Sequence, residues 1–250
     1  MTSSSTTASA GIPAATLILL REQAGGPPLL LMAERSSALA FAGGALVFPG
    51  GRTEPADEVL GRALAPELPD GGARIAAIRE TLEEVGLLPT ADGPPPPDAR
   101  TRLAAGEAFG TVLAEAGLTI RPDLLIPWSR WHPDLPHARV FDTRFYVARA
   151  PEGEPVADGT ETADAFWMTA ADVLDRVATG AASAIFPTRR NLERLALHDS
   201  VDAVLAHARA TPPDLIRPWV ESRDGIDHLC LPEGLGYPIT AEPVDSALRG

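Results

Sequence analysis

Short apolar runs near the start of the chain predict β-strands. Residues 14–20 and 29–33 are apolar and of strand length, and the turn-forming residues Gly25-Gly26-Pro27-Pro28 lie between them. Two such runs with a turn between them predict a β-hairpin. Residues 45–48 predict a third, short strand that leads into a second turn, Pro49-Gly50-Gly51.

Farther along, the apolar spacing becomes helical. Ile75, Ile78 and Leu82 recur at i, i+3 and i+7 within residues 74–85, which predicts a helix with one buried stripe. Gly86 is its expected C-cap. Further elements are helices at 56–65, 102–117, 170–178 and 187–210 (the last with Thr188 as N-cap), strands at 140–148 and 161–168, and two short strands around Arg223-Asp224-Gly225.

Composition and charge narrow the class of protein. The chain has 250 residues, of which 45% are hydrophobic and 22% charged, as in a globular protein with a substantial core. The net charge of −13 argues against nucleic acid and anionic membranes as partners. An anionic small molecule remains compatible, because a metal ion and local arginines can hold it. The single cysteine, Cys230, rules out an internal disulfide and is expected to be buried.

The chain shows no sign of a targeting or membrane-spanning segment. Residues 1–10 are small and polar, without the basic and apolar regions of a secretory signal, and we expect a disordered tail. No organelle address is recognised at the C-terminus, and no apolar run reaches 18 residues. These features predict a cytoplasmic protein.

The predicted helix at 74–85 also carries a cluster of acids. Glu80, Glu83 and Glu84 lie at i, i+3 and i+4, and therefore on one face. Like charges at these spacings destabilise an isolated helix, so something must compensate. A hard divalent cation with oxygen ligands would do so. The alternative is an ordinary acidic helix exposed to solvent.

The residues Arg79-Glu80-Thr81-Leu82-Glu83-Glu84-Val85-Gly86-Leu87, with Phe48-Pro49-Gly50-Gly51 upstream, resemble the signature of the Nudix hydrolase superfamily. That signature is Gly, five residues, Glu, seven residues, then Arg-Glu-apolar-any-Glu-Glu-any-Gly-apolar. Thr81 stands where an apolar residue is usual. An Arg should follow the first Gly by 14 positions, whereas Arg79 follows Gly51 by 28, so an insertion of 14 residues splits the box.

The split leaves one acidic position of the signature in question. Counted back from Arg79, the expected Glu falls on Gly71, with Asp70 as the neighbouring acid that could substitute. A split box of this kind resembles the branch typified by the peroxisomal coenzyme A diphosphatase, nucleoside diphosphate-linked moiety X motif 19.

The resemblance implies a fold and a domain organisation. The expected fold is an α/β/α sandwich with a mixed central sheet and the 74–85 helix on one face. One Nudix domain is expected over residues 11–250, with an insertion at 52–70. A C-terminal extension at 186–250 adds an extra helix and short strands.

The resemblance also implies the site residues. Glu80, Glu83 and Glu84 are expected to hold Mg²⁺ or Mn²⁺, with one of the three as the base and with Glu83 and Glu84 as catalytic residues. Arg79 is expected to orient a glutamate, and Glu83 at i+4 is the partner that helix geometry favours. The backbone at Gly50 and Gly51 is expected to approach the ligand.

Two further groups are candidates with a competing interpretation. Glu161, and more weakly Asp164, could supply a fourth carboxylate, or both could be solvated turn acids. Arg189 and Arg190 could bind substrate phosphates, or form a basic turn that faces solvent.

The expected function is metal-dependent hydrolysis of a nucleoside diphosphate linked to another moiety. Coenzyme A or acyl-CoA, cleaved to 3′,5′-ADP and (acyl-)phosphopantetheine, is one substrate class; ADP-ribose, a dinucleotide or a nucleotide sugar is the alternative. A non-catalytic nucleotide sensor is a third hypothesis, although such modules typically lose the carboxylates that this chain keeps. The expected partner is the small-molecule substrate, and a homodimer is left open.

The insertion at 52–70 has two interpretations. It is rich in Pro, Ala and Glu, which suits a surface excursion that hardly affects the core. Its ends lie beside the predicted site, and the sharper hypothesis is that it forms part of the substrate wall and selects for a bulky group on the diphosphate.

Overall fold

The computed structural model describes residues 11–39, 42–133 and 140–247. Within these ranges the chain forms an eight-stranded mixed sheet in the order β3-β2-β1-β6-β5-β8, with β4 paired to β1 and β7 paired to β2. The strands are β1 (Ile12–Arg21), β2 (Leu29–Arg35), β3 (Leu46–Val47), β4 (Gly50–Arg52), β5 (Ile126–Trp131), β6 (Phe141–Arg149), β7 (Thr162–Thr169) and β8 (Leu215–Ile216).

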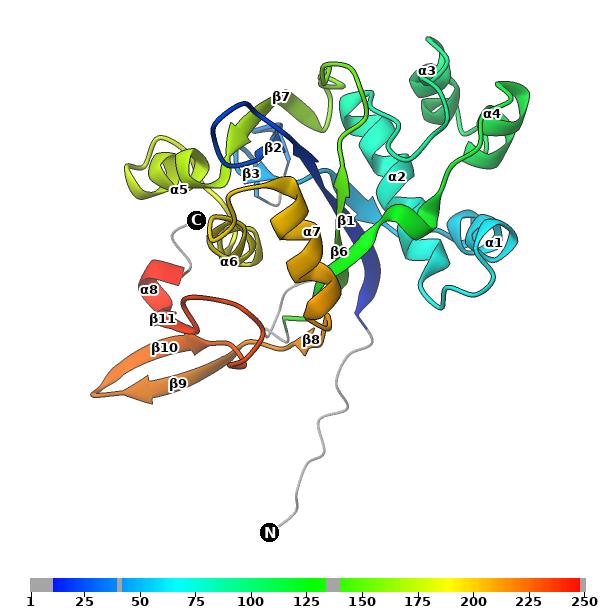
Figure 1. Ribbon diagram of the computed structural model, residues 1–250. Helices are drawn as coiled ribbons and strands as arrows, with labels where there is room; N and C mark the ends of the chain where they lie inside the picture. Colours follow the sequence, from blue (N-terminus) through cyan, green and yellow to red (C-terminus); the bar gives the residue numbers. More distant parts are fainter. Residues whose placement is uncertain (1–10, 40–41, 134–139, 248–250) are drawn as a thin grey trace.

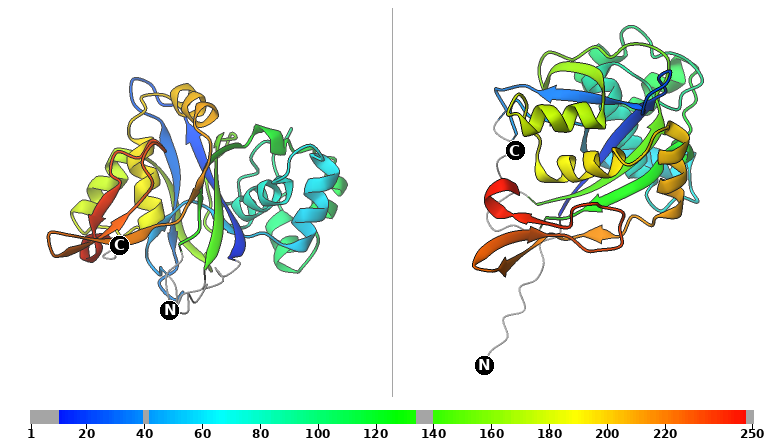
Figure 2. Two further views of the ribbon diagram at one scale, coloured as in Figure 1. Left: turned by 90° about the horizontal axis from the view of Figure 1, so that it is seen from below. Right: turned by 60° about the vertical axis from the view of Figure 1, so that its left-hand side comes forward.

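Helices cover both faces of this sheet (Figure 1). They are α1 (Pro55–Leu64), α2 (Gly71–Val85), α3 (Ala99–Ala104), α4 (Phe109–Glu115), α5 (Ala170–Ala178), α6 (Phe186–Leu195), α7 (Val201–Ala210) and α8 (Val244–Ala247), with a short 3₁₀ turn at Pro122–Leu124. A smaller antiparallel sheet, β11-β10-β9, is built from β9 (Trp219–Arg223), β10 (Ile226–Cys230) and β11 (Ala241–Pro243). Figure 2 shows α1–α4 on one side of the main sheet and α5, α6 and the small sheet on the other.

The central strand β1 has a largely apolar sequence because it is buried on both faces of the sheet. Successive side chains of a strand point to opposite faces. Leu17 and Leu19 belong to the core under α2, whereas Ile18 and Leu20 belong to the core under α5, α6 and α7. Because helices cover both faces, both sets of side chains are buried, which explains the unbroken apolar sequence from Leu17 to Leu20.

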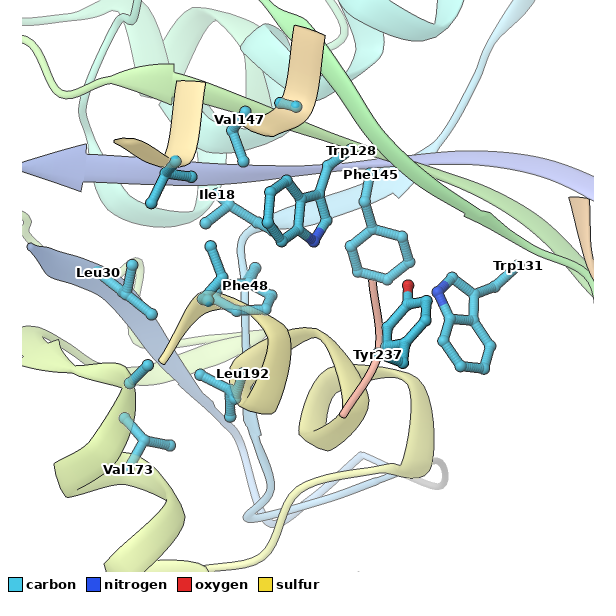
Figure 3. Close-up of a cluster of buried hydrophobic side chains, with 14 of the residues drawn as sticks. Ile18, Leu30, Phe48, Trp128, Trp131, Phe145, Val147, Val173, Leu192 and Tyr237 are labelled. Atoms are coloured by element: carbon cyan, nitrogen blue, oxygen red, sulfur yellow. The ribbon is translucent and has the colours of Figure 1, made fainter. Parts of the chain in front are cut away.

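The core on the α6 side is rich in aromatic residues (Figure 3). Trp128 and Trp131 of β5 are 0% and 1% exposed. The Trp131 ring packs edge-on against Tyr237, with centroids 5.8 Å apart, and against Phe186. The C-terminal segment that carries Tyr237 is therefore part of this core and not a detached tail.

Several predicted elements are confirmed. β1 and β2 pair antiparallel through Leu20↔Leu30 and Arg21↔Leu29, as the hairpin prediction requires. The predicted helices at 74–85, 56–65 and 170–178 appear as α2, α1 and α5, and the strands around the Asp-Gly turn as β9 and β10. Cys230 is buried and free.

Two predicted helices are wrong in extent. The prediction at 102–117 is divided into α3 and α4, because Gly106 between them takes a left-handed φ of +86°. The prediction at 187–210 is divided into α6 and α7, because the Ser200 hydroxyl accepts from the Ala203 N–H and caps a new helix. The N-cap of α6 is Ile185, so Thr188 lies inside the helix instead of capping it.

Two expectations concern the chain as a whole. The tail predicted at residues 1–10 lies outside the described residues. Among the helices that the structure describes, none combines the length and the apolar character needed to cross a membrane.

Candidate functional site

Asp70 fixes the start of helix α2. Its Oδ1 accepts a hydrogen bond from Arg74 Nε at 2.8 Å, and its Oδ2 accepts one from the Tyr146 hydroxyl at 2.9 Å. Both partners are buried. Asp70 is therefore an anchor for the first turn of α2, and the prediction that it could replace the missing acid of the signature is wrong.

The C-terminus of α2 is fixed by a glycine C-cap and by Arg100. Gly86 takes a φ of +73°, and its N–H donates to the Leu82 carbonyl at 3.0 Å, as expected of a C-cap. Arg100 of α3 donates through Nε to the Glu83 carbonyl at 3.0 Å and through Nη2 to the Glu84 carbonyl at 3.3 Å. A cation that satisfies the last carbonyls also complements the helix dipole. Arg100 thus fixes the turn that carries the acids.

The acidic face of α2 packs against the turn at Gly50 and Gly51. Glu84 Oε2 accepts a hydrogen bond from the Gly50 N–H at 3.2 Å. A Cβ on Gly51 would overlap the Glu80 carboxylate, and a Cβ on Gly50 would overlap the backbone of β1 at Ala15. The backbone of β1 cannot move aside, so Gly50 must be glycine, whereas a side chain at Gly51 would push the Glu80 carboxylate out of its place. The two glycines thus bring the turn against the carboxylates of α2.

Arg79 connects the acids to one another. Its Nη1 lies 3.0 Å from Glu83 Oε2 and 3.0 Å from Glu80 Oε1. Its Nε and Nη2 donate to the two carboxylate oxygens of Asp57, each at 3.0 Å, and Nη2 also donates to the Arg52 carbonyl at 3.0 Å. The predicted contact between Arg79 and Glu83 is present, and the bidentate partner is Asp57.

Asp57 is the site residue that the sequence reasoning missed. It lies on α1, is 2% exposed, and also accepts a hydrogen bond from the Glu54 N–H at 2.9 Å. Five residues separate it from Gly51, which is the position of the first Glu in the Nudix signature. Counting back from Arg79 led to Gly71 instead, since the additional residues lie between Asp57 and Arg79. A forward count from Gly51 would have found it.

The cluster contains more negative charge than its arginines neutralise. Burial raises the pKa of Glu80 to about 7 against the opposing effect of Arg79. Burial also raises the pKa of Glu84 to about 8, and the charge of Glu80 adds to this, while the Gly50 N–H opposes it. The pKa of Glu83 is raised as well, chiefly by burial. These shifts show that another positive charge would stabilise the ionised cluster.

A hard divalent cation fits this donor set. Carboxylate oxygens are the ligands that Mg²⁺ and Mn²⁺ prefer. Among the described residues, however, no group of three or more carboxylate, histidine or cysteine side chains is already arranged to hold a metal ion. Glu80 and Glu83 turn toward Arg79, and Glu84 turns toward Gly50. The residues therefore fit a metal by chemistry, without forming a preassembled set of ligands.

The other acidic candidates, Glu161 and Asp164, lie at the start of β7. Glu161 is exposed in the loop before β7, and its charge contributes to the raised pKa of Glu84. The structure therefore brings Glu161 close enough to the α2 acids to act on them. Asp164 lies within β7, exposed and paired in register with Glu34.

Arg189 and Arg190 lie elsewhere. They belong to α6, which covers the opposite face of the sheet from α2 (Figure 2). Arg189 pairs with Glu242 at 2.7 Å, and Arg190 pairs with Glu193 at 2.7 Å and with Glu242 at 2.9 Å. Arg190 is 2% exposed, so the interpretation as a solvent-facing turn is wrong. The structure does not bring the pair together with the acids of α2, because acids of their own side bind them.

Two known proteins resemble this chain over most of its length. A curated Caenorhabditis elegans protein, "Putative nudix hydrolase 7", is 26% identical over 212 residues, which cover 82% of this chain and 68% of that protein. The crystal structure of a NUDIX hydrolase from Alicyclobacillus acidocaldarius matches with a TM-score of 0.71 and 29% identity, covering 78% of this chain and 96% of that one. No protein-family profile matches the chain.

These similarities confirm the predicted fold, a mixed sheet flanked by helices, and support the Nudix hydrolase superfamily for this chain. They support its assignment as an enzyme of the hydrolase class.

Proposed function

We propose that this hydrolase is a metal-dependent diphosphatase whose substrate is a nucleoside diphosphate linked to a second moiety, with coenzyme A or acyl-CoA as the preferred class. One observation carries the metal dependence: Asp57, Glu80 and Glu83 all contact the guanidinium of Arg79, and Glu84 lies beside them, so the acids outnumber this arginine. In keeping with this excess of acids, burial raises the pKa of Glu80 and of Glu84. A divalent cation held by Glu80, Glu83 and Glu84 would neutralise substrate phosphates and activate water.

The residues of the chain have separate tasks in this proposal. Asp57 holds the Arg79 guanidinium by two hydrogen bonds, and Arg79 in turn holds Glu83. The Gly50 N–H fixes one oxygen of Glu84. One of Glu80, Glu83 and Glu84 is the base that takes a proton from the attacking water, and we favour Glu83 or Glu84. In the metal-free protein burial raises the pKa of both Glu83 and Glu84, and a bound cation would favour the ionised form that a base needs.

Glu161 is included in the proposal as a fourth acid. It approaches from the loop before β7, and its charge acts on Glu84. Arg189 and Arg190 are left out, because Glu193 and Glu242 already pair with them on the far face of the sheet.

The preference for coenzyme A over other nucleoside diphosphates rests on the resemblance of the split signature to that branch. ADP-ribose, dinucleotides and nucleotide sugars are the competing substrates, since they present the same diphosphate to the same acids. The sensor hypothesis is weaker, because Glu80, Glu83 and Glu84 are all present and Arg79 and Gly50 contact them.

The experiment is a substrate panel with the purified chain. Coenzyme A, an acyl-CoA, ADP-ribose, a dinucleoside polyphosphate and a nucleotide sugar are each incubated with Mg²⁺, with Mn²⁺ and with EDTA, and the products are identified by mass. We expect 3′,5′-ADP and phosphopantetheine from coenzyme A, and no turnover in EDTA. Faster turnover of another compound would replace coenzyme A as substrate, and activity that survives EDTA would overturn the metal dependence.

A further inference from the structure

An open cleft of about 1110 Å³ lies beside the acids of α2. Its walls are α1 on one side and the α3–α4 pair on the other, and Arg79 and Glu83 line it where it meets the acidic cluster. Figure 1 shows these three helices grouped around α2. The cleft is therefore continuous with the place where the proposed function puts the diphosphate.

Apolar side chains dominate both walls. Val59 and Leu60 of α1 face Leu103, Ala104 and Phe109 across the cleft. Val59 is 61% exposed, although it lies on a helix with little other reason to present a branched apolar side chain to water. Leu103 and Phe109, by contrast, are 8% and 5% exposed and belong to the core that forms the base of the cleft. A concave site lined mainly by apolar side chains is typical of a ligand pocket.

The charged residues of the cleft are mainly acidic. Glu83 belongs to the acids that would hold the cation, whereas Glu54, Glu107 and Asp158 line the rest of the cleft and would repel a further phosphate group. The two lining arginines already have partners: Arg79 binds Asp57 and the α2 acids, and Arg100 binds backbone carbonyls at the end of α2. The cleft thus suits an uncharged apolar chain and disfavours a second anionic group.

We propose that this cleft binds the uncharged, apolar-ended moiety attached to the diphosphate, an acyl-pantetheine chain in an acyl-CoA, while the nucleotide lies on the other side of the acids. The assignment rests on the proposed function for the identity of the substrate. It gives α1 a role beyond holding Asp57: one face of α1 orients Arg79, and another forms the wall that selects the group to be released.

Val59→Asp tests the wall at an exposed position, where the fold tolerates a polar side chain. Leu64→Asp is the matched control, because Leu64 lies on the same helix, is 42% exposed and does not line the cleft. For each variant kcat/KM is measured on octanoyl-CoA and on coenzyme A. We expect Val59→Asp to lower the ratio of the two about tenfold, mainly through the KM of octanoyl-CoA, and Leu64→Asp to leave it unchanged.

A second variant blocks the cleft from the opposite wall. Ala104 of α3 is exposed and lines it, so Ala104→Trp fills space without disturbing a core. We expect a preference for short acyl chains over octanoyl in this variant. The decisive quantity is the ratio of kcat/KM on octanoyl-CoA to kcat/KM on coenzyme A. If this ratio in both Val59→Asp and Ala104→Trp equals the ratio in Leu64→Asp, the proposal is overturned.

A binding measurement separates this proposal from the proposed function. Octanoyl-pantetheine, which carries no phosphate, is titrated calorimetrically into the wild type and Val59→Asp without metal. Binding by the wild type that weakens about tenfold in Val59→Asp supports the cleft even if no nucleotide is hydrolysed, in which case only the proposed function fails. Absence of binding to the wild type overturns the cleft while leaving the hydrolase assignment intact.

Discussion

The two faces of the sheet each bury arginines among carboxylates, and the two clusters differ in their balance of charge. On the α2 face, Arg79 is surrounded by Asp57, Glu80 and Glu83, with Glu84 beside them. On the α6 face, Arg189 and Arg190 pair with Glu193 and Glu242. One cluster is short of positive charge, and the other contains equal numbers of arginines and acids.

This difference separates a functional cluster from a structural one better than burial does. Both clusters are buried, and burial raises the pKa of Glu193 to about 7 just as it does that of Glu80. The α6 cluster pairs two arginines with two acids, so its formal charges balance without a further cation. The α2 cluster cannot, and an incoming cation would offset the repulsion among its acids. Four changes test whether this contrast is correct.

The largest effect is expected from Glu84→Gln. The glutamine keeps the shape of the side chain and an oxygen for the Gly50 N–H, but removes the charge that a metal needs. We expect turnover to fall about 100-fold or more, because the metal supplies several kcal/mol of transition-state stabilisation. Steady-state kinetics on the best substrate of the panel measures this, with thermal unfolding as control for the fold. Near-wild-type turnover would remove Glu84 from the site.

Asp57→Asn should have the next largest effect. It weakens two hydrogen bonds to Arg79 without touching Glu80, Glu83 or Glu84, so Arg79 is free to shift against the acids. We expect kcat to fall about tenfold, as is usual for partners that orient metal ligands. Asp70→Asn is the matched control: it also weakens a buried pair with an arginine, Arg74, but at the far end of α2. Equal kcat in the two variants would contradict a positioning role for Asp57.

Glu242→Gln should break the α6 cluster without affecting catalysis. Arg189 and Arg190 would lose their shared partner and retain a buried charge that is poorly compensated. We expect a loss of about 2 kcal/mol in the free energy of unfolding, measured by urea denaturation, with kcat unchanged for the folded enzyme. A fall in kcat with unchanged stability would bring these arginines back into consideration for phosphate binding.

The smallest effect concerns pH. The folded-state pKa of Glu193 is about 7, above its ordinary value of 4.5, because burial outweighs the nearby Arg190 and Arg189. The contribution of this group to stability is therefore complete below about pH 4.5 and is lost as pH rises through 7. Glu193→Gln should flatten the fall in unfolding free energy over this range by about 1 kcal/mol. An unchanged pH profile of stability in the variant would show that Glu193 is ionised normally.

Local patterns were sufficient to predict the parts of the site that lie within one helix. The spacing of Ile75, Ile78 and Leu82 gave α2, and the i,i+4 spacing gave the contact between Arg79 and Glu83. Gly86 ends the helix as its position after the apolar stripe implied. Each of these features depends on residues within one or two turns of one another, and such interactions are encoded nearby in the chain.

Contacts between segments distant in the sequence were missed, because no local pattern relates their residues. Glu242 is far from Arg189 in the sequence, and no local pattern couples them. Asp57 could have been predicted by counting forward from Gly51, because the 14 additional residues lie between Asp57 and Arg79. The breaks before α4 and α7 were overlooked because helix-forming residues continue on both sides of Gly106 and Ser200.

The pairing of β1 with β6 has a consequence for how the chain is made. Residues 12–20 of β1 lie parallel to residues 141–149 of β6 along their whole length, so the centre of the sheet joins segments that leave the ribosome far apart in time. Strands β2 and β4 and helix α2 precede β6 in the chain and contact β1, but until β6 emerges the other edge of β1 has no strand to pair with. Non-local parallel pairing of this kind makes folding slow and exposes strands to aggregation in the meantime. We therefore expect a lower growth temperature or added chaperones to raise the recombinant yield of this protein.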